Sequence, residues 1–486
     1  MVPHGWDFEH DLFVLWGEDA DVIRSLLAAG QKRVVLFGGS PVPAMSAIWP
    51  VQSIDHIKPV VDLHWSELPG ERVVTRISPA FSALVDAAAL EQAARDALQG
   101  WQSNWGMWSR HGERWLLQRL ANMAYLAVHP TVSALGGAFS GRPAFLISPG
   151  PSLEKNGAAL AEYKGRAVLI ASAQALGALK RLGVIPDIVV VLDYLDLKYL
   201  FDGVKFDQIG ALVLSYDVHP DLFDLPTLRF GYSGNAGVGA WSHQFLGERC
   251  ELPGGGSVAC TAFSLALELG CSSLALVGQD LALSDGKMYA TGASHGQLHV
   301  RIKDDGTLHH VYEGFSSSIQ AAMEGHEAVD SVRLPGYYGG QVLSQVAFGT
   351  YRRWFCRIAR DVGSERKLFN CTEGGAFIDG MIHRPLTEFA REFCVDSFSV
   401  AEVLADRTRR FDRRARYDRV NRHVCALKTL LDGQPYAGPE RAACESLIGE
   451  FQALPLPPHT LPARVDQLRM LVDAVVRKLA GSAPQI

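Results

Sequence analysis

The sequence predicts an α/β protein with a central Rossmann-like parallel sheet that carries helices on both faces. This core is flanked by a small N-terminal α/β domain and a C-terminal helical domain. Three observations predict it. Short apolar runs alternate with helical segments between residues 141 and 385, several of these runs end in glycine or a polar residue, and the chain is 48% apolar and 20% charged. Continuous apolar strands separated by helices are typical of a parallel sheet that is covered on both faces.

Residues 1–140 are predicted to form the N-terminal α/β domain with a helical connector. Residues 19–31 have helical spacing, and the connector is expected over residues 84–135. Three short runs in this part have the pattern of strands, at residues 33–39, 60–65 and 72–78.

Residues 141–385 are predicted to form a separate central domain. Strands are expected at residues 144–147, 166–171, 187–193, 211–215 and 273–278, and helices at 157–163, 175–182 and 257–269. Residues 386–486 are predicted to be a C-terminal helical domain, because apolar residues recur at helical spacing over 386–431, 440–453 and 461–479.

The net charge, the first residues and the cysteine pattern indicate where the protein is located and which partners it lacks. The formal net charge is -6, whereas a general nucleic-acid binder is usually basic. The chain starts without a basic-then-apolar order, and its longest mostly apolar run, residues 167–179, is too short to span a bilayer. Eight cysteines without a Cys-x-x-Cys pair favour reduced thiols. We therefore expect a cytoplasmic protein without a transmembrane segment and without nucleic-acid partners.

The strongest local motif is Ser-Pro-Gly-Pro-Ser-Leu-Glu-Lys-Asn at residues 148–156, directly after the first strand of the central domain. A strand that enters a glycine turn and then a helix points several backbone N–H groups at one spot, which favours phosphate. Gly150 would let the backbone approach a ligand, Pro151 would fix the turn, and the Ser152 hydroxyl would donate to a phosphate oxygen. The alternative is a tight turn in which Ser152 is only a helix N-cap.

Three further segments are expected at the same sheet edge. Asp193 ends the third strand of the domain, and the glycine-rich stretch 254–261 opens a helix with Ser257 as a second candidate for binding an anion. Gly278, Gln279 and Asp280 follow the fifth strand. Ligands of doubly wound sheets bind outside the carboxyl ends of the strands, so these segments are candidates for one site.

Taken in order, these motifs resemble a known family. Six segments carry the resemblance: Gly-Pro-Ser-Leu-Glu-Lys-Asn at 150–156, Pro-Asp-Ile-Val-Val-Val-Leu-Asp at 186–193, Gly-Gly-Ser-Val-Ala-Cys-Thr-Ala-Phe at 255–263, Val-Gly-Gln-Asp-Leu-Ala at 277–282, Gly-Gly-Gln-Val-Leu at 339–343 and Asn-Cys-Thr-Glu-Gly-Gly-Ala-Phe-Ile-Asp-Gly at 370–380. Together they look like the motility-associated factor (Maf) flagellin glycosyltransferases. The central domain of that family is similar to bacterial CMP-sialic-acid-dependent sialyltransferases and to MptE-like proteins.

The resemblance implies transfer of a nonulosonic acid, such as pseudaminic or legionaminic acid, from a CMP-sugar to Ser or Thr hydroxyls of flagellin. Gly150, Pro151 and Ser152 would hold the CMP phosphate. Ser257 and Thr261 would lie near the nucleotide, and Gly278, Gln279 and Asp280 would line the donor pocket. On this resemblance residues 141–385 are the catalytic domain that binds the nucleotide sugar. The CMP-sugar is a co-substrate, we expect no separate cofactor, and we assign no metal ligands, although the resemblance leaves a metal requirement open.

Two alternatives come from other classes. A smaller enzyme group with the same central domain comprises ATP-dependent 6-hydroxymethyl-7,8-dihydropterin diphosphokinases. The other is a non-catalytic flagellin-binding scaffold, which is favoured by Ala173 at a position where many Maf members have Asp.

The polar segment 284–312 is expected to be a long loop or lid over the donor. An acceptor hydroxyl needs a base, and histidine suits neutral pH. Of the four histidines in the segment we choose His295 as the base, with Tyr289 as a phosphate partner. Within it, Asp-Asp-Gly at 304–306 indicates a hairpin turn rather than a metal site. Glu373 would stabilise a turn or touch the donor. The arginine-rich stretch 407–422 is expected to be a solvated helix face.

Overall fold

The computed structural model describes residues 11–16, 34–37, 48–51, 57, 72–77, 86–234, 239–248, 250–284, 286–294, 296, 298–311, 328–454 and 461–483. The chain divides into two compact units. One contains residues 1–113 and 452–458, and the other contains residues 114–451 and 459–486. Each unit is described by itself.

The first unit contains a four-stranded parallel sheet in the order β3-β2-β1-β4. Its strands are β1 (Asp11–Trp16), β2 (Val34–Phe37), β3 (Ile48–Val51) and β4 (Arg72–Ile77). The strands expected at 33–39 and 72–78 are therefore confirmed, while β1 and β3 were not predicted. The helix expected at 19–31 and the strand expected at 60–65 lie outside the described residues.

The predicted helical connector is confirmed as α3 (Ala87–Leu126), followed by the short 3-10 helix η3 (Val132–Leu135). The Asp86 carboxylate accepts hydrogen bonds from the backbone N–H groups of Ala88 and Ala89 and so caps the start of α3.

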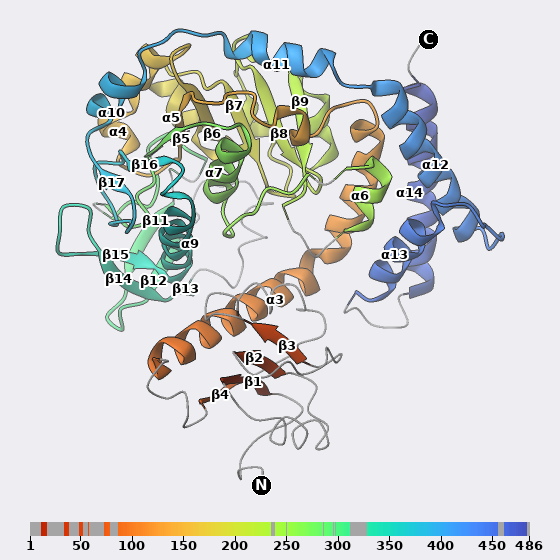
Figure 1. Ribbon diagram of the computed structural model, residues 1–486, viewed down its shortest axis with the longest axis horizontal. Helices are drawn as coiled ribbons and strands as arrows, with labels where there is room; N and C mark the ends of the chain where they lie inside the picture. The colour runs from red at the N-terminus through yellow and green to blue at the C-terminus, as the bar shows by residue number, and fades with distance from the viewer. Residues whose placement is uncertain are drawn as a thin grey trace. The chain divides into compact units, whose positions relative to one another are not determined.

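The second unit is built on an eight-stranded parallel sheet in the order β17-β16-β10-β5-β6-β7-β8-β9 (Figure 1). The predicted strands are confirmed as β5 (Pro143–Ile147), β6 (Val168–Ser172), β7 (Ile188–Val191), β8 (Ala211–Ser215) and β10 (Ser273–Val277). The sequence did not predict β9 (Leu228–Tyr232), β16 (Lys367–Asn370) or β17 (Ile382–His383).

Every residue of β5, β6, β7, β8 and β10 is buried, because helices cover both faces of the sheet. Alternate residues of the central strands, such as Phe145, Leu169 and Ala275, join one core cluster. That cluster also contains residues of α4 (Leu153–Asn156), η4 (Gly157–Tyr163), α5 (Leu176–Arg181) and α10 (Leu386–Phe393). The helix α7 (Val258–Glu268) packs on β5, β6 and β7.

The order of the strands places a switch point between β5 and β10. From β5 the chain adds β6, β7, β8 and β9 on one side, and α7 then returns it to β10 on the other side of β5. The carboxyl ends of β5 and β10 therefore meet at the kind of crevice where doubly wound sheets bind ligands.

Four further short 3-10 helices lie between strands of this sheet: η5 (Ala173–Ala175), η6 (Lys198–Phe201), η7 (Phe206–Gln208) and η8 (Pro220–Asp224). A short helix, α6 (Trp241–Leu246), follows β9.

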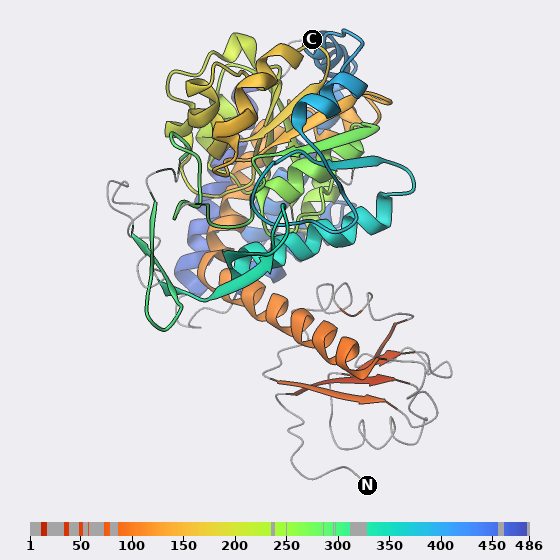
Figure 2. The same cartoon turned by 90° about the vertical axis from the view of Figure 1, so that its left-hand side faces the viewer.

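The prediction that residues 284–312 form one long loop is wrong in its second half. Residues 299–311 form an antiparallel hairpin of β11 (His299–Ile302) and β12 (Leu308–Val311), which pairs with β13 (Ala328–Val329). The Lys303 N–H donates to Thr307 and the Asp305 carboxylate accepts from the Thr307 N–H, so the Asp-Asp-Gly stretch is the hairpin turn that we expected. A second hairpin, β14 (Ser331–Pro335) and β15 (Gln341–Gln345), lies beside α9 (Val346–Val362) (Figure 2, teal).

The C-terminal part is helical, as predicted, with α11 (Val400–Arg409), α12 (Arg413–Leu431), α13 (Arg441–Gln452) and α14 (Leu461–Gly481). The α12 helix packs on α14 and α6. The segment leading into α11 follows the amino ends of the strands, because the Phe398 N–H donates to Gly165, which precedes β6 (2.7 Å). None of the helices in the described ranges combines the length and apolar character that a membrane span needs.

Candidate functional site

The motif at residues 148–156 directly contacts the segment Gly278–Asp280 at the crevice between β5 and β10. The Gly150 N–H donates to the Gly278 carbonyl at 2.8 Å, and the Ser148 hydroxyl donates to the Gln279 side-chain oxygen. Both contacts join the turn after β5 to the turn after β10. The expectation that these two motifs share one edge of the sheet is therefore confirmed.

A carboxylate occupies the predicted phosphate-binding turn. The Ser152 hydroxyl donates to Asp280 Oδ2 at 2.6 Å, and the Ser152 N–H lies 3.2 and 3.3 Å from the two carboxylate oxygens. Ser152 is 1% exposed and Asp280 is 2% exposed. The donors of this turn are thus used by a side chain of the protein itself, and the phosphate contact of Ser152 stays a prediction.

Burial controls the ionisation of Asp280. Removal from water raises the pKa of this carboxyl to about 6, although the hydrogen bonds from Ser152 and the charge of Lys155 act in the opposite direction. A carboxyl with such a pKa exchanges its proton close to neutral pH. Perturbed groups of this kind cluster at functional sites, which makes Asp280 the most distinctive titratable residue at this edge.

Close approach of the two turns explains the glycines at this position. A β-carbon on Gly150 would lie 2.1 Å from Asp280 Oδ2 and 2.4 Å from the Gly278 carbonyl oxygen. Gly278 has φ +67°, and a β-carbon there would lie 2.2 Å from the Ser148 carbonyl oxygen. These glycines let the β5 and β10 turns contact each other, whereas the sequence suggested that Gly150 admits a ligand. Pro151 lies half-buried beside them, and the Ser152 side chain does not cap α4.

Asp193 and Thr261 form a separate group near the end of β7. Asp193 follows that strand and accepts a hydrogen bond from the Leu195 N–H (3.5 Å), and burial raises its pKa. The Tyr232 hydroxyl donates to Val191, the last residue of β7, and lies beside Thr261. Two strand spacings, roughly 10 Å, separate β7 from β5. The predicted residues thus share one edge of the sheet but form two clusters along it.

Ser257 is the N-cap of α7. Its hydroxyl oxygen accepts a hydrogen bond from the Cys260 N–H at 3.3 Å. Of the preceding glycines, Gly255 lies beside the ring of Trp354 and Gly256, with φ +87°, beside the ring of Tyr351, and both rings belong to α9. An eleven-residue helix therefore begins in a glycine-rich, partly exposed turn at this edge.

The segment that was expected to be a lid lies across the ends of β5 and β6. The Ala290 N–H donates to Pro149 (2.7 Å), the Ser294 N–H donates to Gln174 (3.1 Å), and the Thr291 N–H donates to the Glu154 carboxylate (2.6 Å). Tyr289 is thereby held next to the Ser148–Ser152 turn and packs edge-on against Phe348. His295 lies outside the described residues. His299, His309 and His310 lie on the β11–β12 hairpin, where His310 is buried.

A buried ion pair that the sequence analysis missed lies at the end of β8. Arg119 of α3 makes two hydrogen bonds of 2.7 Å to the two oxygens of Asp217. Its side chain is 1% exposed, and a β-carbon on Gly239 would clash with it. A bidentate pair of this geometry positions α3 on the strand end. Arginine in an apolar helix was the available signal, but its partner is 98 residues away.

Glu373 stabilises the turn after β16, which was one of the two roles considered for it. Its backbone has φ +56°, a conformation that non-glycine residues rarely adopt. Its carboxylate oxygen Oε1 accepts hydrogen bonds from Asn156 Nδ2 (2.9 Å) and the Leu386 N–H (3.0 Å). The neighbouring Thr372 hydroxyl accepts a hydrogen bond from the Gln279 N–H (3.2 Å). The turn after β16 is thus tied to both turns of the central crevice.

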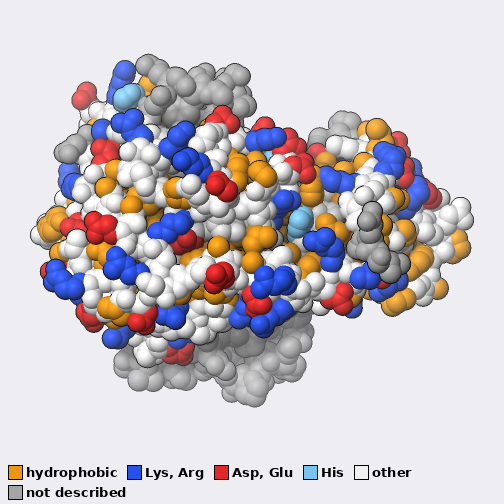
Figure 3. All heavy atoms as spheres, turned by 90° about the horizontal axis from the view of Figure 1, so that it is seen from above, with side chains coloured by type: hydrophobic (Ala, Val, Ile, Leu, Met, Phe, Trp, Pro, Cys, Tyr) orange, Lys and Arg blue, Asp and Glu red, His pale blue; other side chains and the backbone are white. Residues whose placement is uncertain are grey.

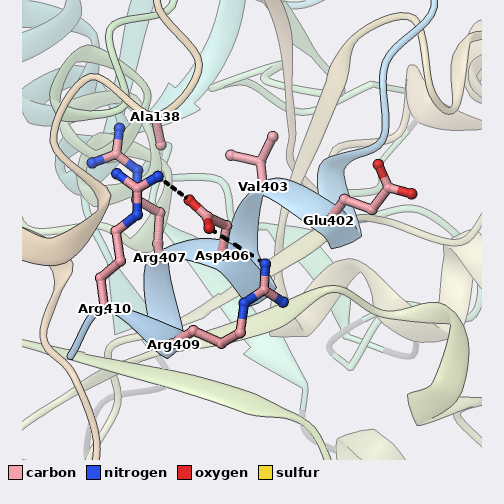
Figure 4. Close-up of a pocket in the computed structure, with 7 residues that line it drawn as sticks. All are labelled: Ala138, Glu402, Val403, Asp406, Arg407, Arg409 and Arg410. Atoms are coloured by element: carbon pink, nitrogen blue, oxygen red, sulfur yellow. Dashed lines mark hydrogen bonds and ion pairs between the residues drawn. The ribbon is translucent and has the colours of Figure 1, made fainter.

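Two hollows of the described surface lie away from this crevice. One, of about 510 Å³, lies beside α11 and is lined by Ala138, Glu402, Val403, Asp406, Arg407, Arg409 and Arg410 (Figure 4). Asp406 pairs there with Arg409 (3.3 Å) and Arg410 (2.7 Å), so part of the arginine-rich stretch is the self-paired helix surface that we expected. A second hollow, of about 400 Å³, is lined by Leu117, Gln118, Ala121, Gln467, Met470 and Leu471.

Neither sign of charge dominates the one face of the molecule that Figure 3 shows. The face shown in Figure 3 intersperses basic and acidic side chains. In the part of the chain that the structure describes, no three His, Cys, Asp or Glu side chains are grouped so that they could hold a metal ion.

The central region is similar to a known family model. Residues 117–286 match the family model described as 6-hydroxymethylpterin diphosphokinase MptE-like. This match supports the resemblance to MptE-like proteins that the motifs indicated. Among solved structures, a Maf glycosyltransferase from Magnetospirillum magneticum AMB-1 has 16% sequence identity and a TM-score of 0.49, over 96% of this chain and 73% of that chain. No curated protein matches the chain.

Proposed function

We propose that this protein is a glycosyltransferase that moves a nonulosonic acid from a CMP-sugar to Ser or Thr hydroxyls of flagellin. Pseudaminic and legionaminic acid are the sugar types that the motif resemblance implies. The proposal combines a doubly wound sheet, a set of ordered motifs and a titratable carboxyl at its switch point.

The observation that carries the proposal is the contact between the Ser148–Ser152 turn and the Gly278–Asp280 turn. Motifs 130 residues apart in the sequence are joined there by hydrogen bonds at the switch point of the sheet, where such folds bind nucleotides. The Asp280 side chain marks the position at which Ser152 offers one N–H and one hydroxyl donor to an oxygen atom. A donor phosphate would use the same N–H and hydroxyl groups once Asp280 is protonated or turned away.

The departing CMP requires stabilisation of its phosphate charge. In our proposal the N–H and hydroxyl of Ser152 provide it on the β5 side, and the N-terminus of α7 at Ser257 provides a second positive end. Asp193 and Thr261 would then lie near the nucleoside.

The acceptor hydroxyl must lose its proton as its oxygen forms the new bond to the anomeric carbon, while CMP departs with the electrons of the broken bond. His295 remains our candidate base, with Tyr289 as the neighbouring phosphate partner. The contact of Ala290 with Pro149 supports this arrangement, because it keeps the segment beside the turn.

A transfer assay tests the proposal. The purified protein would be incubated with a CMP-nonulosonate and flagellin, and intact-mass spectrometry would measure the added mass of one acidic sugar. The expected result is transfer by the wild type and a loss of transfer in His295→Ala, with His299→Ala on the hairpin as the control. Flagellin of unchanged mass in a strain that lacks this protein would contradict the proposal.

The family model favours a second candidate. Its description names a 6-hydroxymethylpterin diphosphokinase, and it covers the strands from β5 to β10. This activity would transfer diphosphate from ATP to the hydroxymethyl group of the pterin and would release AMP. Incubation with ATP, Mg²⁺ and 6-hydroxymethyl-7,8-dihydropterin, followed by detection of AMP, separates the two candidates.

A further inference from the structure

An exposed aromatic ring is held rigidly at the rim of the proposed site. Tyr338, in the turn between β14 and β15, is 78% exposed. Its hydroxyl nevertheless donates to the Glu373 carbonyl (3.1 Å), and its ring packs edge-on against Tyr337 with centroids 4.8 Å apart. A ring with both ends of its side chain fixed loses little further freedom when a ligand stacks on its open face.

Tyr337, which packs against the ring of Tyr338, is held by several contacts of its own. The Tyr337 hydroxyl donates to Asn370 at the end of β16 (3.2 Å), and the Tyr337 N–H donates to Gly375 (2.8 Å). The Tyr337 ring packs against His383, which in turn stacks on Phe377 with centroids 4.1 Å apart. The turn that carries Tyr338 is thus attached to the carboxyl end of the central sheet.

A positive charge borders the same rim. Lys155 is exposed, and its Nζ lies 3.7 Å from the position that a β-carbon on Gly374 would take. Gly374 follows Glu373, the residue that anchors the Tyr338 hydroxyl. An aromatic face and an ammonium group therefore flank one short segment, Glu373–Gly374, whose other neighbours are Ser152 and Asp280.

We propose that Tyr338 is the platform for the sugar ring of the donor and that Lys155 pairs with the carboxylate of that sugar. The inference rests on the proposed function and names the part of the donor that this rim recognises. A pyranose presents a flat face of C–H groups that packs on an aromatic ring, with its polar groups at the edges. A cytosine base would also stack, but it is neutral and gives Lys155 no partner, so the charge favours an acidic sugar.

Three probes separate the parts of the donor: CMP, CMP-N-acetylneuraminic acid, and the methyl glycoside of N-acetylneuraminic acid, which lacks the nucleotide. Calorimetry and saturation-transfer NMR would measure their binding to the full-length wild type, Tyr338→Ala and Tyr338→Phe. Val395→Ala removes another exposed apolar side chain, 66% exposed, near the opposite edge of the sheet and serves as the control.

We expect Tyr338→Ala to weaken the CMP-sugar and the glycoside about three- to tenfold while CMP binding stays within about twofold. Tyr338→Phe should keep most of the affinity because it keeps the ring, and Lys155→Ala should weaken the two sugar probes but not an uncharged analogue in which the carboxylate is an amide. Because Tyr338 is exposed, the urea midpoint of Tyr338→Ala should match that of the wild type.

Equal weakening of CMP by Tyr338→Ala would overturn the inference, since the ring would then stack on the base. Unchanged binding of all three probes would overturn it as well. A failure of the proposed function would give a different pattern of binding. If wild-type protein binds the glycoside in a Tyr338-dependent way but binds neither CMP nor the CMP-sugar, the platform stands and the nucleotide donor is wrong.

Discussion

Asp280 and Ser152 are joined through both the backbone N–H and the hydroxyl of the serine, so that a buried carboxylate occupies the turn that resembles a phosphate-binding loop. The two residues come from the ends of adjacent strands, β5 and β10, and each is at most 2% exposed. Binding of any second anion at this turn must therefore involve the charge of Asp280.

The first prediction concerns stability and pH. Burial raises the pKa of Asp280 from about 3.8 in the unfolded chain to about 6 in the fold. Between these values the folded protein holds a proton that the unfolded chain has lost, so the contribution of Asp280 to stability falls as pH rises through this window and is constant above it. The total change is roughly 3 kcal/mol.

Urea unfolding of the wild type and Asp280→Asn at pH 4 to 8 measures this change. The difference in unfolding free energy between them isolates Asp280 from Asp187, Asp193 and Glu450, whose pKa values burial also raises. A difference that does not vary with pH would contradict the prediction.

The second prediction concerns anion binding. At pH 8 the ionised Asp280 repels a phosphate at Ser152, so Asp280→Asn should bind CMP about tenfold more tightly than the wild type, the scale of one close like-charge contact. Calorimetry measures the affinity, and the matched control is Asp187→Asn, which changes a buried carboxyl at the amino end of β7. Loss of CMP binding in Asp280→Asn would instead show that the carboxylate contacts the nucleotide directly.

The third prediction separates the capping role of Ser257 from nucleotide binding. Ser257→Ala should cost about 1 kcal/mol of stability, because the Cys260 N–H loses its partner. Ser257→Asp restores the cap, since aspartate caps helices as well as serine, but it places a negative charge at the start of α7. We therefore expect wild-type stability and weakened CMP binding in Ser257→Asp. Unchanged CMP affinity would remove the α7 N-terminus from the site.

The fourth prediction concerns the buried pair of Arg119 and Asp217. Arg119→Met leaves the Asp217 carboxylate buried without its bidentate partner and should cost about 3–5 kcal/mol in unfolding free energy. The double variant Arg119→Met with Asp217→Leu removes both charges and should recover part of this loss. A double variant that loses the sum of the two single-variant losses would show that the pair is not coupled, because the double-mutant cycle then gives no interaction energy.

The fifth prediction uses the turn at Glu373. Both hydrogen bonds that its carboxylate accepts go to the same oxygen, Oε1, and glutamine supplies an equivalent carbonyl oxygen. Glu373→Gln should therefore keep most of the stability, whereas Glu373→Ala should lose about 2 kcal/mol, the scale of hydrogen bonds to a charged group. Thermal unfolding compares the two, and an equal loss would argue against these hydrogen bonds.

The strand predictions were correct for segments made almost entirely of aliphatic residues. They missed segments that also contain charged, polar or glycine residues. The runs that became β7 and β8 consist almost entirely of Val, Ile, Leu and Ala, which is how strands buried on both faces read. In contrast, β9 contains Arg229 and Gly231, and β16 begins with Lys367 and ends with Asn370. These strands form because the existing sheet offers each of them a neighbour, and local sequence does not encode that pairing.

The candidate site, too, was predicted from the sequence only in part. Strand patterns and turn residues alone determined that Ser152, Asp193, Ser257 and Asp280 lie at one edge of the sheet, because the carboxyl ends of parallel strands share an edge. Only the tertiary structure decided that Asp280 fills the Ser152 turn, that Arg119 pairs with Asp217, and that Tyr338 is fixed at the rim. Each of these contacts depends on strand order and on distances between residues far apart in the chain, and periodicity along a sequence carries no information about either.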